Sequence, residues 1–271
     1  MPELPEVETS RRGIEPHLCN QKITAIIVRN RQLRWPISVR LQKEATASTI
    51  NAVRRRAKYL LIDTSQGCII IHLGMSGSLR MIDNKVPAEK HDHVDIVLSS
   101  GQALRLRDPR RFGAVFWTKN DPLKHLRLKD LGKEPLEDAL TAEWLYGQSR
   151  NRKRAIKSFI MDSKIVVGVG NIYACESLFL AGIHPNKPAG KLSMQRWEKL
   201  THAIKDVLSK AIKQGGTTLK DFTRSDGQPG YFARQLTVYG REGKPCKKCG
   251  ETLKKITQGQ RSTFYCSQCQ K

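Results

Sequence analysis

The first residues of the chain bring together two groups that can attack a sugar carbon and open the sugar ring. If Met1 is removed, Pro2 becomes a free N-terminal secondary amine with the carboxyl group of Glu3 directly beside it. A neutral amine is a nucleophile, and a carboxyl group can donate or accept a proton. The reference pKa of an α-amino group is roughly 8, so a useful fraction is neutral near pH 7. We therefore expect Pro2 to be a nucleophile and Glu3 to move protons at the sugar.

Four cysteines have the spacing of a structural zinc site. They follow the pattern C-x2-C-x16-C-x2-C, at Cys246, Cys249, Cys266 and Cys269. Four thiolates complete a tetrahedral shell and leave no position for a catalytic water, so we expect one structural zinc ion. The alternating residues between the two pairs predict a β-hairpin, with Lys254, Lys255 and Arg261 projecting from it toward phosphates.

The charge of the chain points to a polyanionic partner. Its 271 residues include 48 Lys and Arg against 25 Asp and Glu, which gives a formal net charge of +23. The basic residues cluster at 54–58, 105–111 and 152–154, and a field of this sign favours nucleic acid. No apolar run is long enough to span a bilayer, and no basic amphipathic helix stands out, so we expect no membrane partner.

The cysteine count and the N-terminus bear on the compartment. Acidic residues stand where an export signal would have a basic region, so we expect none. Seven cysteines is an odd number, and Cys19, Cys68 and Cys175 are isolated, which favours small packed side chains over a disulfide framework. We therefore expect a reducing, cytoplasmic protein, and a monomer, since no heptad pattern suggests an oligomer.

Short apolar runs predict strands in the first half of the chain. They lie at 23–28, 59–62, 68–73, 94–98, 104–106 and 114–117, after a helix that begins near Pro5. Strands at such close spacing predict an antiparallel sandwich or barrel. Glu6 and Glu8 have two interpretations that stay equally open, one as an acidic helix start and one as functional groups.

Helical periodicity replaces the strands beyond residue 131. Helices are predicted at 142–149, 155–161 and 172–180, with a longer one that ends at Gly215-Gly216. The segment from Val166 to Asn171 lies between two helices and predicts a tight turn. We expect an α+β chain with domains at 1–131, 132–236 and 237–271.

Five motifs in order resemble bacterial formamidopyrimidine-DNA glycosylases over essentially the whole chain. They are Pro2–Glu8, His72–Gly77, Asp108–Gly113, Gly168–Tyr173 and the cysteine tail. The related endonuclease VIII branch, which removes oxidised pyrimidines, typically has Gly where this chain has Leu4. That residue favours the purine-specific branch.

The resemblance implies an N-terminal antiparallel β-sandwich, a helix–two-turns–helix module and a C-terminal zinc finger, with DNA in the cleft between the halves. It implies a bifunctional glycosylase and abasic-site lyase of base excision repair that excises 8-oxoguanine and formamidopyrimidines from double-stranded DNA. Pro2 would form the Schiff base, Lys58 would serve β-elimination and Arg261 δ-elimination. Nucleoid association would follow from DNA binding. The implied DNA contacts are His91, Arg110, Lys153 and Asn171, with Lys58 near the phosphates.

A flipped nucleotide leaves a hole that apolar side chains can fill. Met75 and Phe112 are the candidate wedge, and Arg110 could hydrogen-bond the base left without its partner. From the residues alone, core packing is the favoured interpretation of Met75 and Phe112, and the resemblance reverses it. The turn-rich segment around 217–232 is open between a plain surface loop and a lid over the flipped base.

Two alternatives remain beside the purine glycosylase. One has the same chemistry on oxidised pyrimidines, against which Leu4 speaks. The other is a non-catalytic zinc-ribbon DNA-binding protein, which would explain the charge and the cysteines but gives no reason for Pro2 and Glu3.

Overall fold

The computed structural model describes residues 2–217 and 235–271, which form two compact units. Residues 2–129, joined by 214–217, make up the first unit, and 130–213 with 235–271 make up the second. No helix in the described part of the chain is both long and apolar enough to cross a membrane.

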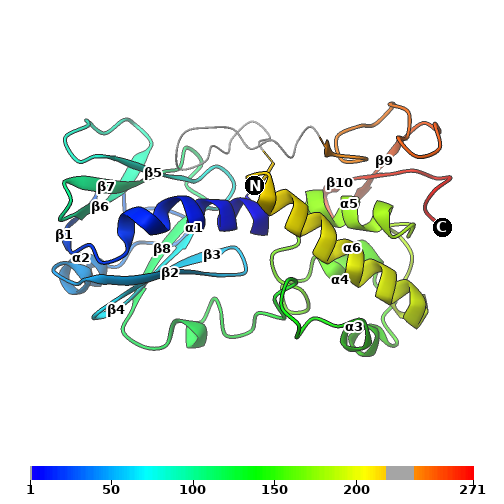
Figure 1. Cartoon of the computed structure of the whole chain (residues 1–271), viewed down its shortest axis with the longest axis horizontal. Helices are drawn as coiled ribbons and strands as arrows, with labels where there is room; N and C mark the ends of the chain where they lie inside the picture. Colours follow the sequence, from blue (N-terminus) through cyan, green and yellow to red (C-terminus); the bar gives the residue numbers. More distant parts are fainter. Residues whose placement is uncertain (1, 218–234) are drawn as a thin grey trace. The chain divides into compact units, whose positions relative to one another are not determined.

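The first unit is a sandwich of two four-stranded antiparallel sheets (Figure 1). One sheet has the order β1-β6-β7-β5, with β1 at Ile23–Val28, β6 at Asp92–Leu98, β7 at Gln102–Arg107 and β5 at Ser78–Asp83. The other has the order β2-β3-β4-β8, with β2 at Ile50–Arg56, β3 at Tyr59–Thr64, β4 at Gly67–His72 and β8 at Ala114–Thr118. Apolar side chains from both sheets form one buried cluster, so the predicted sandwich is confirmed.

Two helices close the open sides of this sandwich. Helix α1 (Leu4–Leu18) packs against β2 and β3 of one sheet and against the edge strand β5 of the other. Helix α2 (Val39–Ala45) packs against β1 on one sheet and against β4 and β8 on the other. Val7, Ile14 and Leu18 of α1 are fully buried, as their helical spacing predicts. The start of the chain is therefore fixed against both sheets.

Strands β2 and β5 and helix α2 were not predicted from the sequence. In β2 the buried Ile50 and Val53 are three residues apart and the arginines of 54–56 follow them directly, so the segment shows no apolar alternation. Helix α2 has only seven residues, too few for its periodicity to stand out, although Ser38 caps its start by accepting from the backbone N–H of Arg40.

The second unit is helical and ends in a hairpin. It contains α3 (Ala142–Ser149), α4 (Ile156–Ile160), α5 (Asn171–Leu180) and α6 (Met194–Lys213). Helix α6 packs against α3 and α5 through a buried stripe that includes Trp197, Leu200 and Leu208. The hairpin strands β9 (Lys254–Gln258) and β10 (Arg261–Tyr265) follow, and β10 packs against α5. A single 3-10 turn lies at Ala189–Lys191, and another lies in the first unit at Pro122–Lys124.

Part of the basic sequence is structural. Arg105 is buried and hydrogen-bonds both carboxylate oxygens of Asp95. It also pairs with Asp92, while Arg29, just after β1, donates to Asp95. Burial alone would raise the pKa of Asp95, but hydrogen bonds from Arg105 and Arg29 hold it below its usual value. The run 105–111 therefore contributes less to a DNA-attracting surface than its composition suggested.

We predict that Arg105→Leu lowers the free energy of unfolding by about 3–5 kcal/mol, because it leaves Asp95 and Asp92 as buried carboxylates with one fewer cation. The matched control is Arg54→Leu on β2, whose side chain is 47% exposed and pairs with Asp63. It should cost at most about 1 kcal/mol. Urea unfolding of both variants measures the difference, and equal losses would contradict the assignment.

Candidate active site and metal centre

The beginning of α1 is fixed by a reciprocal capping box. The N-cap is Glu3, and its backbone N–H donates to Oε2 of Glu6 at 2.7 Å. The other oxygen of Glu6, Oε1, accepts from the backbone N–H of Thr217 at 2.8 Å. Pro2, Glu3 and Glu6 are all buried. Glu6 thus has a structural role, and the E-x-x-E spacing was the signal that could have identified Glu3 as the cap.

Lys58 lies in the tight turn between β2 and β3. Arg56 pairs with Tyr59 across the hairpin, so Ala57 and Lys58 are its two turn residues. Ala57 is buried and has a φ of +55°, which is uncommon for a residue with a Cβ. Lys58 itself is half-buried. The predicted β-elimination residue is therefore held on a constrained turn and not on a solvated basic face.

His72, at the end of β4, is a neutral hydrogen-bond acceptor. Burial, together with the positive charges of Lys58 and Arg34, lowers the pKa of His72 to about 4. Its Nδ1 accepts from the backbone N–H of Gly74 at 3.0 Å, and its ring contacts that of Tyr59 at a tilt of 50°, with centroids 4.8 Å apart. His72 therefore joins the Lys58 hairpin to the loop that carries Met75.

The two side chains of the candidate wedge are exposed. Met75 is 37% and Phe112 46% exposed, so neither belongs to the core. Their loops meet at Gly74, where a Cβ would lie 2.3 Å from the carbonyl carbon of Phe112. Gly74 also has a φ of +63°, so both space and backbone conformation call for glycine. The core-packing interpretation of Met75 and Phe112 is thereby excluded.

A buried carboxylate joins the same two loops. Asp108, fully buried, accepts from Ser76 Oγ and from the backbone N–H of Gly113, both at 2.7 Å. Ser76 Oγ in turn accepts from the backbone N–H of Arg110 at 3.2 Å. Sequence reasoning missed the roles of Asp108 and Ser76, because their loops are more than thirty residues apart in the chain.

A cavity of about 690 Å³ opens beside these loops. Its lining combines apolar and cationic side chains: Gln32, Leu33, Arg34, His72, Gly74, Met75, Arg110, Arg111 and Phe112. Arg110 is exposed at this cavity. His91 is half-buried just before β6, and its carbonyl accepts from the backbone N–H of Asp108. The first unit therefore holds Met75, Arg110 and Phe112 at one place on its surface.

In the second unit a buried lysine connects the predicted Asn171 to the hairpin strand of Arg261. Lys157 is 1% exposed, and its Nζ donates to Asn171 Oδ1 at 2.5 Å and to Thr263 Oγ1 at 2.6 Å. Asn171 donates from Nδ2 to the carbonyl of Ser262 at 2.9 Å. Arg261 is exposed and, with Lys157, lines a cavity of about 230 Å³. Lys157 was not predicted, since nothing in its sequence context separates it from other helical lysines.

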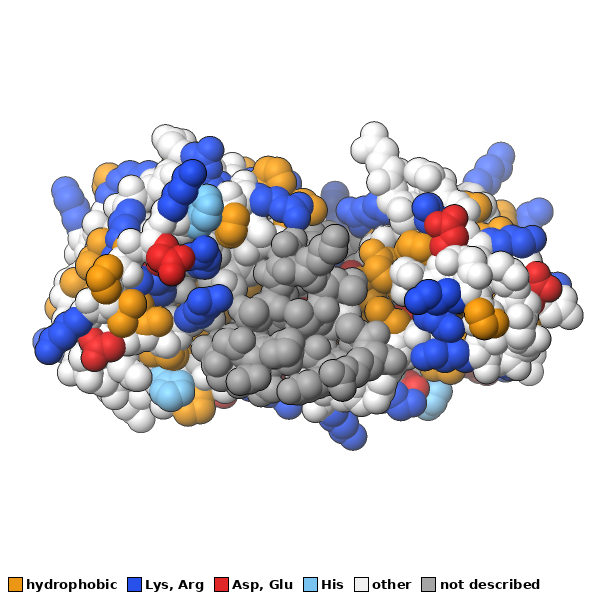
Figure 2. Space-filling model, turned by 90° about the horizontal axis from the view of Figure 1, so that it is seen from above, with side chains coloured by type: hydrophobic (Ala, Val, Ile, Leu, Met, Phe, Trp, Pro, Cys, Tyr) orange, Lys and Arg blue, Asp and Glu red, His pale blue; other side chains and the backbone are white. Residues whose placement is uncertain are grey.

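Lys153 is exposed in the segment between α3 and α4. On the face drawn in Figure 2, Lys and Arg side chains are spread over both units and Asp and Glu side chains are few. The lid expected around 217–232 falls on residues outside the described part of the chain from 218 onward.

The four predicted cysteines lie together in a group that could hold one metal ion. Their Sγ atoms all lie within 4.8 Å of one another, with 4.0 Å between Cys246 and Cys269 and 3.5 Å between Cys249 and Cys266. Four sulfurs at about 2.3 Å from one ion lie roughly 3.8 Å apart in a tetrahedron. A disulfide would need about 2.05 Å, so the two-disulfide alternative does not apply. The cluster therefore fits one structural zinc ion.

The chain entering the finger is tied to α5. Glu176 is buried and accepts from the backbone N–H groups of Thr237, Val238 and Tyr239 at 2.8–2.9 Å. A carboxylate that satisfies three backbone donors is strongly held.

A strongly basic chain of two units with a four-cysteine hairpin of this kind belongs to the class of zinc-containing nucleic-acid-binding proteins.

Comparisons with known proteins identify the family. Residues 1–115 match the formamidopyrimidine-DNA glycosylase N-terminal domain, 131–223 its H2TH domain, and 243–271 the zinc finger found in FPG and IleRS. The formamidopyrimidine-DNA glycosylase of Stutzerimonas stutzeri is 57% identical over 271 residues and is covered completely, as is this chain.

Two solved structures have the same fold. The Lactococcus lactis Fpg in complex with DNA containing an abasic site has a TM-score of 0.92, 34% identity and 99% coverage of both chains. A glycine-to-proline mutant of the Lactococcus lactis protein, in complex with DNA containing Fapy-dG, has a TM-score of 0.91, 33% identity and full coverage of both chains. The chain belongs to the formamidopyrimidine-DNA glycosylase family.

We predict that Cys249→Ser or a strong chelator removes the zinc and exposes the amides of β9 and β10 to hydrogen exchange, because metal binding supplies much of the folding free energy of so small a module. The sandwich of the first unit should stay protected. Cys19→Ser, which lies outside the cluster, is the matched control and should retain one zinc per chain. Unchanged protection in β9 and β10 after zinc loss would contradict this prediction.

We also predict a pH effect centred on His72. Its folded pKa of about 4 lies below the unfolded value of about 6.5, so between these pH values the unfolded chain binds the extra proton. Its contribution to the free energy of unfolding is therefore complete above pH 6.5 and falls as the pH drops toward 4. In urea unfolding, the wild type should lose about 1–2 kcal/mol relative to His72→Asn between pH 7 and pH 5. A difference in the free energy of unfolding between the two proteins that does not change with pH would contradict this prediction.

Proposed function

We propose that this chain is a bifunctional DNA glycosylase and abasic-site lyase of base excision repair that excises oxidised purines, with Pro2 as its nucleophile. The observation that carries the proposal is the Pro2–Glu3 pair at the beginning of α1, in a chain that belongs to this family over its whole length. The Lactococcus relatives bind Fapy-dG and abasic DNA, which are the expected substrate and reaction intermediate.

In the first step, the neutral nitrogen of Pro2 attacks C1′ of the flipped nucleotide, and the bond from C1′ to the damaged base breaks with its electron pair on the base. Pro2 then loses its N–H proton, and the departing base takes up a proton from solvent. Glu3 protonates the ring oxygen as the sugar opens, which leaves an iminium between Pro2 and C1′. A secondary amine gives an iminium that stays cationic without a proton. The partial positive charge at the N-terminal end of α1 disfavours an ammonium ion there, and so favours the nucleophilic form of Pro2.

In the second step, the iminium draws electrons from C2′ and acidifies its hydrogen. We assign Lys58 to the proton transfers of β-elimination, in which the bond to the 3′ phosphate breaks. Arg261 is assigned to δ-elimination, in which the bond to the 5′ phosphate breaks. Lys58 belongs to the first unit and Arg261 to the second.

The remaining site residues are assigned to DNA binding. His91, Arg110, Lys153 and Asn171 contact the DNA, and Met75 and Phe112 fill the stack where the nucleotide leaves. The exposure of Met75 and Phe112, beside an exposed Arg110, supports this assignment. The net charge of +23 supports a large phosphate contribution to affinity and a strong dependence on salt.

We propose that the chain has three domains, at 1–131, 132–236 and 237–271. It acts as a monomer. We place it in the cytoplasm of a bacterium, associated with the nucleoid through DNA binding.

We predict that sodium borohydride traps a covalent adduct between the chain without Met1 and a duplex with 8-oxoguanine opposite cytosine, because hydride reduces the iminium. Pro2→Gly should lose most base excision, while duplex affinity changes by less than about threefold, since the phosphate contacts that dominate affinity remain. Intact mass identifies both the processed N-terminus and the adduct.

The same assay separates the alternatives. An oxidised pyrimidine in place of 8-oxoguanine should give slower trapping, and faster trapping would favour the pyrimidine branch. Duplex binding by a processed chain without any adduct would leave a non-catalytic zinc-containing DNA-binding protein. Parallel loss of excision and affinity in Pro2→Gly would indicate misfolding in place of a lost nucleophile.

A further inference from the structure

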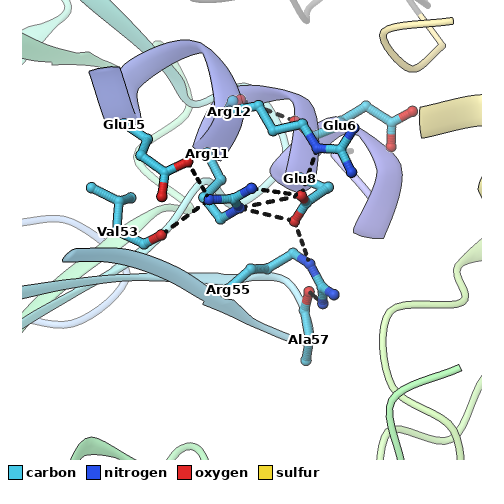
Figure 3. A network of polar contacts seen from close by, with 9 residues as sticks. Glu6, Glu8, Arg11, Arg12, Glu15, Val53, Arg55 and Ala57 are labelled. Carbon is cyan, nitrogen blue, oxygen red and sulfur yellow. Dashed lines mark hydrogen bonds and ion pairs between the residues drawn. The ribbon is translucent and has the colours of Figure 1, made fainter. Parts of the chain in front are cut away.

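An arginine-rich network joins α1 to strand β2 (Figure 3). Its centre is the carboxylate of Glu8, which is 8% exposed. Glu8 Oε1 accepts from Arg12 at 2.8 Å and from Arg11 at 3.0 Å, and Oε2 accepts from Arg55 Nε at 3.1 Å. Three guanidinium groups therefore converge on one carboxylate.

The network keeps Glu8 charged. Burial alone would raise the pKa of Glu8, but hydrogen bonds from Arg11 and Arg12 and the charge of Arg55 hold it below its usual value. Arg11 also donates to the carbonyl of Val53 on β2 at 3.2 Å and to Glu15 at 2.7 Å. The Glu8 carboxylate is thus an ionised anchor on the helix that begins with Glu3.

Arg55 connects this anchor to the next turn of the chain. While its Nε donates to Glu8, its Nη1 donates to the carbonyl of Ala57 at 3.1 Å. The Arg55 side chain is only 13% exposed, so both hydrogen bonds are largely shielded from solvent. A guanidinium can hold two acceptors at once because its donors are fixed in one plane.

The carbonyl that Arg55 holds belongs to a strained residue. Ala57 has a φ of +55°, a region that a residue with a Cβ adopts only at a cost in free energy. Such a conformation persists only where its surroundings over-determine it. Lys58 follows directly, so the direction of its side chain depends on the backbone of Ala57.

We propose that Glu8 and Arg55 are positioning residues for the β-elimination step: Glu8 orients Arg55, and Arg55 holds the Ala57 turn that directs Lys58. This inference rests on the proposed function, in which Lys58 moves the proton of that step. The link starts on α1, the helix that follows Pro2 and Glu3, and ends at Lys58. Glu8 and Arg55 therefore set the position of the elimination group relative to the nucleophile within one unit.

The test separates base excision from strand cleavage in single-turnover assays. Arg55→Lys keeps the positive charge, but a single ammonium cannot donate to Glu8 and Ala57 with the same geometry. We expect the ratio of strand-cleavage rate to borohydride-trapping rate to fall about 10- to 100-fold, since displacements of about 1 Å can have effects of this size. Arg55→Met removes the charge as well and should show the same loss.

The matched control is Arg12→Met. Arg12 contacts the same carboxylate from α1, but its side chain is 59% exposed, and its hydrogen bond to Glu8 does not involve the Ala57 turn. The ratio in this variant should stay within about twofold of wild type, because an exposed ion pair contributes little to the geometry of the network. Thermal unfolding of all three variants identifies any loss of folding. If Arg55→Met is unfolded at the assay temperature, the result for Arg55→Lys decides the test.

Three outcomes overturn the inference, two in the arginine variants and one in Lys58→Met. Either Arg55→Lys cleaves and traps in the wild-type ratio, or Arg12→Met loses cleavage as strongly as the Arg55 variants. Failure of the proposed function has a different signature, since the wild-type chain without Met1 would then give no borohydride adduct. If Lys58→Met keeps the wild-type ratio while trapping is normal, the assignment of Lys58 is wrong and the positioning role falls with it.

Discussion

The position at which α1 begins is the constraint on which the candidate active site depends. Glu3 and Glu6 satisfy each other's backbone groups, and Glu6 also binds the backbone of Thr217, more than two hundred residues away. The same helix packs against the edges of both sheets. The proposed nucleophile, Pro2, directly precedes this helix start, which holds its backbone in place. Little conformational entropy is therefore lost when the reaction begins.

The positive charge of the chain serves two purposes that composition alone does not separate. Arg105 and Arg55 are largely buried and bound to carboxylates, and they connect strands to strands or to α1. Arg110 and Lys153, to which we assign DNA contacts, are exposed. A basic run is therefore a mixture, because alternate residues of a strand face opposite sides of a sheet.

Much of the fold followed from sequence patterns. Strand β1 and helix α3 lie where the periodicity predicted them, and the cysteine spacing predicted both the metal cluster and its hairpin. Strand β2 was missed because arginines fill its second half, although Arg54 binds Asp63 on β3 and Arg55 binds Glu8 on α1. Local propensity is a weak guide where a polar side chain has a tertiary partner.

The sequence by itself determined which chemistry is available: a proline that becomes an amine beside a carboxyl group once Met1 is removed, four thiols at zinc spacing, and a basic composition that suits DNA. Only the tertiary structure decided how these groups are held. It placed Asp108 and Ser76 between the loops of Met75 and Phe112, Lys157 between Asn171 and Thr263, and Arg55 between Glu8 and Ala57. The physical reason is that a motif fixes residue types and spacing along the chain. The direction of a side chain depends instead on hydrogen bonds and packing with segments that are distant in sequence.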